Sequence, residues 1–161
     1  MMSPAKSIKF LAILFILFSL FGCQKFNKIK IKQLNNVLHF DFSAMGESIK
    51  ADKKYLLYDI GVSKLNCSSN CVVWEMLRKE EYFDSNAYPL EASYVVYGET
   101  LEAMKSVVGP NDLSTGEYSV AANVSLVLDD KFIKSELFIS KFRLIVSGEG
   151  EVILPDNKYE N

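Results

Sequence analysis

The residues from Tyr118 to Asp129 alternate strictly between two faces, and this stretch constrains the fold more than any other. Apolar side chains occupy the even positions up to Leu128, whereas polar Ser119, Asn123 and Asp129 fall among the odd ones. Successive side chains of a β-strand point to opposite faces, so this alternation predicts a long strand with one buried face. A helix would instead need apolar residues spaced three and four apart.

Similar alternation recurs along the chain between turn signals. It predicts strands near residues 28–32, 37–42, 55–65, 72–77, 93–97 and 132–146, with a short last strand near 151–154. Asp129 to Lys131 is typical of a hairpin connection. The charged segment 77–86 fits either a helical turn or a long loop, and 101–107 fits either a short helix or an extended segment.

Two strands show most clearly which side chains should be buried. In the strand near 37–42, Leu38, Phe40 and Phe42 share one face. In the strand near 55–65, the same reasoning places four apolar side chains together, namely Leu56, Tyr58, Ile60 and Val62.

Seven or eight alternating strands separated by turns predict an all-β protein, an immunoglobulin-like antiparallel β-sandwich. Trp74 lies in the middle of a strand, and Tyr118 follows Thr115 and Gly116 at the start of a late one. In immunoglobulin-like folds a tryptophan fills the core and a tyrosine fixes a corner. The alternative is that both are ordinary core aromatic residues of another β fold.

The N-terminal residues have the order of an export signal. Lys6 and Lys9 precede an apolar run from Phe10 to Phe21, and no acidic residue lies near them. A bilayer-spanning helix needs about 20 apolar residues, and this run is shorter. We therefore expect a cleaved signal helix before the folded domain.

The stretch Leu20–Cys23 resembles the bacterial lipobox, although Phe21 is larger than the residue usual at its position. The resemblance implies diacylglycerol and palmitate on Cys23, with cleavage after Gly22. The chain then divides into a lipoprotein signal peptide at 1–22, a lipidated N-terminus and short tether at 23–30, the sandwich domain at 31–155 and a polar tail at 156–161. The alternatives are a secreted protein with a stray cysteine or an uncleaved anchor.

This anchor predicts the location of the protein. Acyl chains on Cys23 would hold it on a lipid bilayer of the bacterial envelope, facing the periplasm. Gln24 stands where aspartate retains lipoproteins in the inner membrane of enteric-type bacteria, which favours the outer membrane. Residues 1–22 carry two lysines and no acidic residue, so without them the net charge falls from −2 to about −4. A nucleic-acid-binding protein would show a basic face instead.

Two cysteines remain, Cys67 and Cys71, with three residues between them. An oxidising periplasm favours a disulfide between them, which would fix the turn between two strands. The alternatives are free thiols, or redox or copper chemistry, but a copper site would want a histidine as well. The only histidine, His39, has no sequence reason to lie near the pair.

No set of residues in the sequence predicts an active site, a cofactor or a metal. His39 could serve a serine triad, but no nucleophile-elbow motif, phosphate-binding glycine loop or paired-histidine motif is present. We therefore expect a binding protein and not an enzyme. The expected binding surface is the segment 78–86, with the acidic residues Glu80, Glu81 and Asp84, together with the region 98–116. The alternative is that these are merely solvated loops.

The order of several short motifs resembles small bacterial lipoproteins described as periplasmic immunity proteins of type VI secretion systems. The motifs are Tyr55–Ser63, Val72–Glu75, Tyr97-Gly98 and Gly116–Val120, which follow the lipobox. The likeness spans roughly residues 20 to 146 and implies an immunoglobulin-like fold that binds a toxin effector. It implies no catalytic residues and does not include the cysteine pair. A structural or assembly lipoprotein of the envelope or of a secretion machine is the alternative.

Overall fold

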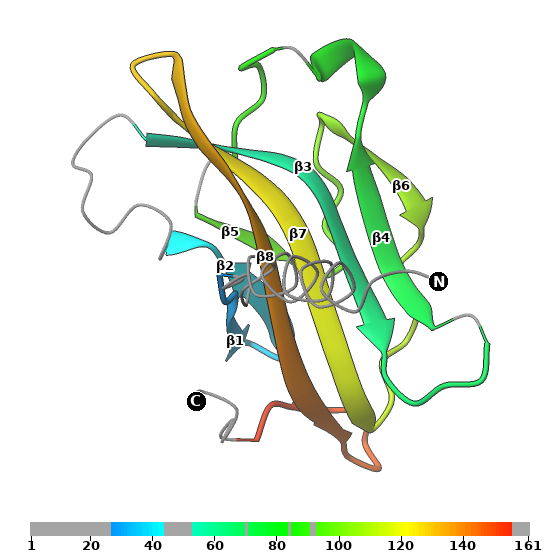
Figure 1. Ribbon diagram of the computed structural model, residues 1–161. Helices are drawn as coiled ribbons and strands as arrows, with labels where there is room; N and C mark the ends of the chain where they lie inside the picture. Colours follow the sequence, from blue (N-terminus) through cyan, green and yellow to red (C-terminus); the bar gives the residue numbers. More distant parts are fainter. Residues whose placement is uncertain (1–26, 44–52, 70, 84, 91–92, 156–161) are drawn as a thin grey trace, which may run out of the picture.

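The computed structural model describes residues 27–43, 53–69, 71–83, 85–90 and 93–155. Their regular elements include nine strands and the short 3₁₀ turn η2 (Glu80–Tyr82) (Figure 1). The strands are β1 (Lys30–Leu34), β2 (Val37–Asp41), β3 (Lys53–Lys64), β4 (Val72–Arg78), β5 (Tyr94–Val96), β6 (Met104–Val108), β7 (Gly116–Leu128), β8 (Lys131–Val146) and β9 (Val152–Ile153).

The strands form two antiparallel sheets packed as a sandwich. One has the order β1-β2-β5, and the other has the order β6-β4-β3-β7-β8-β9. The long strands β3, β7 and β8 cross the front of Figure 1, and the three-stranded sheet lies behind them. This confirms the predicted all-β antiparallel sandwich. The segment 101–107 could form a helix or an extended strand by its sequence; in the structure its residues 104–107 are part of β6, and 101–103 form a turn before it.

The strand order matches most of an immunoglobulin-like sandwich: it has additional strands, and its smaller sheet has no counterpart of strand D. Strands A, B and E of that fold correspond to β1-β2-β5, and strands C, F and G correspond to β3-β7-β8. The tyrosine corner is present on β7, because the Tyr118 hydroxyl donates to the carbonyl of Ser114 at 2.7 Å. Trp74 differs from the immunoglobulin pattern: it lies on β4, one strand further from β7.

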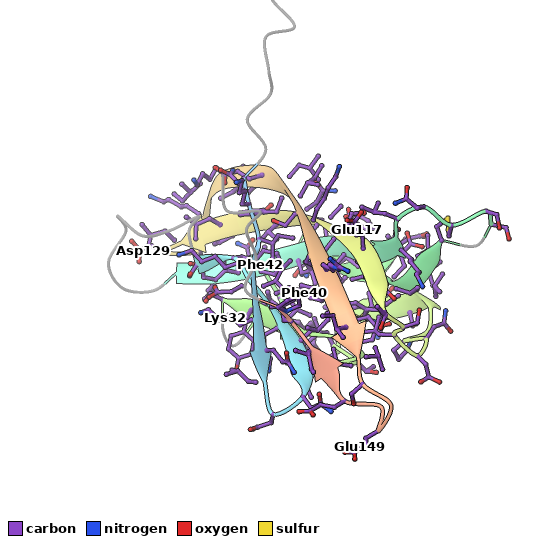
Figure 2. All side chains as sticks on the ribbon, turned by 90° about the horizontal axis from the view of Figure 1, so that it is seen from below. Lys32, Phe40, Phe42, Glu117, Asp129 and Glu149 are labelled. Atoms are coloured by element: carbon purple, nitrogen blue, oxygen red, sulfur yellow. A yellow bond between two sulfur atoms is a disulfide. The ribbon has the colours of Figure 1, made fainter. Side chains whose placement is uncertain are left out.

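Aromatic side chains fill the space between the sheets. Phe40 packs against Trp74 and Phe142, with ring centroids 6.1 and 6.2 Å apart, and Phe42 packs edge-on against Phe138 at 5.5 Å. All five are buried. Figure 2 shows Phe40 and Phe42 in the middle of the molecule. Burial of a side chain of this size contributes about 1.5–3 kcal/mol, so this cluster is a main source of stability.

A β-bulge in β3 overturns one expectation about the buried face. The register with β7 shifts between Leu57 and Asp59. A bulge adds one residue to a strand and therefore exchanges its two faces on one side of the bulge. As a result Leu57 joins Ile60 in the core, whereas Tyr58 is only half-buried and packs against Phe83 at 6.0 Å. The prediction that Leu56 and Tyr58 share the core face was wrong.

The two sheets are joined along one side of the sandwich. Asn27 forms a parallel bridge with Phe138, and Ser140 on β8 exchanges hydrogen bonds with both backbone groups of Ile29. Further along, the Gln33 side chain accepts from the Leu154 amide at 2.7 Å. Residues 27–30 of the predicted tether therefore belong to the sandwich.

Two tight hairpins set the strand register. Asn35 and Asn36 connect β1 to β2, and Asp129 and Asp130 connect β7 to β8. All four have positive φ, between 49° and 66°. Asparagine and aspartate tolerate this region, and two such residues make the turn type that matches strand twist. The hairpin predicted at Asp129 is confirmed.

Within the described residues, no helix is long and apolar enough to cross a membrane.

Candidate functional site

A buried arginine organises the loop that follows β4. Arg78 is the last residue of β4, and its side chain is 1% exposed. Its guanidinium donates to four main-chain carbonyls: Tyr82 at 2.9 Å, Leu57 at 3.3 Å, Ser85 at 3.2 Å and Ala87 at 2.6 Å. Residues 82–83 and 85–87, which we call the Arg78 loop, therefore supply three of the carbonyls around the guanidinium, and β3 supplies the fourth.

Main-chain carbonyls take the place of water around the Arg78 guanidinium. The guanidinium also lies over the Tyr58 ring, 5.6 Å from its centroid, because the bulge in β3 turns that ring outward. Burial lowers the pKa of Arg78 from its usual value, although arginine stays charged at neutral pH. Among the described residues, no carboxylate forms an ion pair with it. Its role is to position the loop.

A cleft of about 350 Å³ opens beside Arg78. Two segments line it, residues 88–90 after the Arg78 loop and residues 99–104 between β5 and β6. Leu57 and Tyr94 contribute from β3 and β5. The cleft lies where the connection from the smaller sheet reaches the larger one. Both sheets and the Arg78 loop therefore fix its shape.

Two half-exposed tyrosines line this cleft. Tyr88 and Tyr94 are each 43% exposed. The Tyr94 ring packs against the ring of His39, with centroids 5.1 Å apart. Tyr88 packs edge-on against Tyr82 at 4.9 Å and has a positive φ of 51°, which is unusual for a bulky residue. The hydrogen bond with Tyr82, and then the negative charge of Glu102, raise the pKa of Tyr88.

Two carboxylates stand on the other segment of the cleft. Glu99 and Glu102 are exposed lining residues. Glu99 is fixed by its own turn, since its carboxylate accepts from the Val96 amide at 3.1 Å and its amide donates to the Val96 carbonyl at 3.1 Å. Gly98 makes this turn with a φ of +80°. With Arg78, the formal charge of the lining side chains is −1.

Of the predicted partner-binding residues, Glu80 and Glu81 do not line this cleft. Glu80 and Glu81 are exposed on η2, and Asp84 falls outside the described residues. Within the expected binding segment 78–86, Arg78 is buried, because its side chain donates hydrogen bonds to the loop carbonyls from inside. The region 98–116 does contribute, through Glu99 and Glu102. The prediction from sequence included that region, but it did not identify Glu99, Glu102 or the two tyrosines as binding residues.

The structure joins Cys67 to Cys71 by a disulfide, with a Cα–Cα distance of 5.8 Å. The bridge lies in the connection between β3 and β4, as expected, and the Lys64 amide donates to the Cys71 carbonyl at 2.7 Å. Cys23 lies outside the described residues. His39 is on β2, where its ring contacts Tyr94.

The described part of the chain shows no group of three or more histidine, cysteine, aspartate or glutamate residues that could hold a metal ion. The feature best suited to recognition is the cleft, which combines aromatic rings, carboxylates and rigid support. Comparison with family models, curated proteins and solved structures finds no match to this chain.

Proposed function

We propose that this protein is a lipid-anchored lipoprotein of the bacterial envelope that binds and neutralises a toxin delivered to the periplasm. The observation that carries the binding role is the cleft, whose two loops are fixed to a rigid sandwich. Loops on a rigid scaffold are where recognition is usually located. The order of motifs that resembles type VI secretion immunity proteins supports a toxin as the partner.

The fixed geometry of the cleft suits a binding surface. Arg78 holds the first loop through four carbonyls, and the turn at Gly98 holds Glu99. A surface that is already ordered loses less conformational entropy on association, which raises affinity for a given contact area. The exposed residues Glu80 and Glu81 on the neighbouring turn add negative charge, which would speed the capture of a basic partner.

The proposed anchor is consistent with the path of the chain. Asn27 and Ile29 lie along β8, so only residues 24–26 separate this first described segment from Cys23. Three extended residues span about 10 Å. An acylated Cys23 would therefore hold the sandwich close to the membrane, on the periplasmic face of the outer membrane in our proposal.

The test is a survival assay with the product of the neighbouring gene sent to the periplasm. Co-expression of this protein should restore growth, and the two proteins should co-purify. The double variant Glu99→Lys/Glu102→Lys should lose most protection. Its matched control, Glu149→Lys/Glu151→Lys, makes the same charge change on the β8–β9 turn, at the lower edge of Figure 2, and should protect fully.

If no neighbouring product is toxic in the periplasm, or if survival is the same without this protein, the immunity proposal fails. The assembly role in the envelope or a secretion machine would then take its place. Co-purification with an envelope component, and not with a toxin, would be the result expected from that role.

A further inference from the structure

We infer that the cleft beside Arg78 is a pocket for a basic side chain, arginine or lysine, on the surface of the protein partner. This inference rests on the proposed binding function and specifies its partner. Four side chains carry it: the rings of Tyr88 and Tyr94 and the carboxylates of Glu99 and Glu102, all of which line the same cleft.

The lining chemistry favours a cation. A guanidinium or ammonium group is attracted to the face of a tyrosine ring, and both tyrosines line the cleft and are 43% exposed. The two carboxylates can accept the N–H donors of the same group. Arginine suits the pocket best, because its planar guanidinium can stack on a ring and bind a carboxylate at once.

Arg78 does not make this a pocket for anions. Its side chain is 1% exposed, and its donors are directed to four carbonyls of the protein. An incoming anion would instead meet the exposed carboxylates of Glu99 and Glu102 first. Because two carboxylates outnumber one guanidinium, the lining side chains are net negative and complement a cation.

The size of the cleft argues for a single side chain. Its volume of about 350 Å³ is near the lower end of the range for small-molecule sites, which is about 300–1,000 Å³. Protein interfaces commonly place one large residue in such a pocket, and arginine is enriched among these anchors.

The backbone of Tyr88 is a further sign of a functional position. Its φ of 51° is unfavourable for a residue with a large side chain, so its surroundings must impose it. They do so through Tyr82, which packs on the ring, and through the Arg78 loop that ends at Ala87. Unfavourable backbone conformations of this kind concentrate at binding and catalytic sites.

The experiment uses the full chain in a neutral detergent, with ¹³C-labelled tyrosine rings observed by NMR. The probe is the blocked tripeptide acetyl-Gly-Arg-Gly-amide. It is compared with the same peptide carrying citrulline, which keeps the shape but lacks the charge, and with one carrying glutamate. The signals of Tyr88 and Tyr94 are assigned with the variants Tyr88→Phe and Tyr94→Phe.

The arginine peptide should shift both tyrosine signals in a saturable way, with a Kd in roughly the millimolar range for so small a ligand. The citrulline peptide should bind at least about threefold more weakly, and the glutamate peptide should not bind. Glu99→Gln/Glu102→Gln should weaken arginine binding by roughly two- to fivefold for each carboxylate. Glu149→Gln/Glu151→Gln should leave the affinity unchanged.

Equal binding of the arginine and citrulline peptides would overturn the inference, as would shifts confined to tyrosines outside the cleft. The peptide comparison does not use the carboxylate variants, so it decides even if Glu99→Gln/Glu102→Gln misfolds. The outcome is also separate from that of the survival assay. If Glu99→Lys/Glu102→Lys still protects the cell, the immunity function stands and the proposed pocket for a basic side chain is refuted. If the arginine peptide binds but no neighbouring gene product is toxic, the pocket stands and the immunity function is refuted.

Discussion

Replacement of Arg78 by methionine tests whether this side chain holds the loop that shapes the cleft. Methionine fills a similar volume but donates nothing, so the carbonyls of Leu57, Tyr82, Ser85 and Ala87 lose their shared donor. A hydrogen bond to a charged group contributes about 1.5–3 kcal/mol. The bonds to Tyr82 and Ala87 are short, at 2.9 and 2.6 Å, whereas the other two exceed 3.1 Å and are weaker.

The expected net loss is smaller than the sum of these bonds. Four bonds to one group are not additive, and removal of a buried charge also removes its desolvation cost. We expect Arg78→Met to lower the free energy of unfolding by about 3 kcal/mol. Stabilities of domains are typically about 5–15 kcal/mol, so the variant should remain folded.

Urea unfolding followed by the fluorescence of Trp74 measures this change. With an m-value of about 1.5 kcal/mol per molar urea, the midpoint should fall by about 2 M. Arg78→Lys should lose about half as much, because an ammonium has three donors and no planar fork. The matched control is Arg143→Met at an exposed position of β8, which should change stability by less than about 0.5 kcal/mol. A loss below about 1 kcal/mol for Arg78→Met, or one equal to that of the control, would refute the reasoning.

Four other predictions concern three single residues and one pair of cysteines. Cys23→Ser should leave an uncleaved precursor that takes up no labelled palmitate; cleavage and lipidation of the variant would exclude this anchor. Replacing Cys67 and Cys71 by serine should cost at most about 2 kcal/mol in urea unfolding, because the closed loop is short; thiols of the native protein that alkylate without reduction would contradict the bridge. Burial raises the pKa of Tyr97 to about 12. The folded protein therefore holds this proton more tightly than the unfolded chain, so stability should be complete below about pH 10 and fall as the pH rises from 10 to 12. Tyr97→Phe should reduce that slope in unfolding measured across this pH range, and an unchanged slope would show that other groups cause it. Tyr118→Phe should cost about 1–2 kcal/mol in urea unfolding, since it removes the corner hydrogen bond; no measurable loss would mean that the corner does not stabilise the fold.

The sequence by itself determined the strands and the class of fold. Side-chain alternation has the period of a strand, so the pattern at 118–129 specifies β7 and its buried face without knowledge of its neighbours. The hairpin at Asp129 and the pairing of Cys67 with Cys71 were also predictable, because both involve residues close together in the chain. The tyrosine corner belongs here too, since Tyr118 bonds to Ser114 only four residues away.

Only the tertiary structure decided which residues of β3 face the core and where the Arg78 side chain lies. The alternation at 55–65 gives no sign of the bulge, which depends on how β3 pairs with β7. Arg78 looks like one more charge in a polar loop, yet it is buried among carbonyls from β3 and from its own loop. A sequence pattern records what each position prefers but not which distant carbonyls converge on one guanidinium.

The cleft also depended on the tertiary structure. Tyr88 comes from the connection before β5, Tyr94 from β5 itself, and Glu99 and Glu102 from the connection after it, and these segments carry no common motif. They meet because β5 belongs to the smaller sheet and β6 to the larger one, so that the chain crosses between the sheets beside the Arg78 loop. Local patterns fix strands through contacts between near neighbours, whereas this site exists only through contacts between segments that the sheet order brings together.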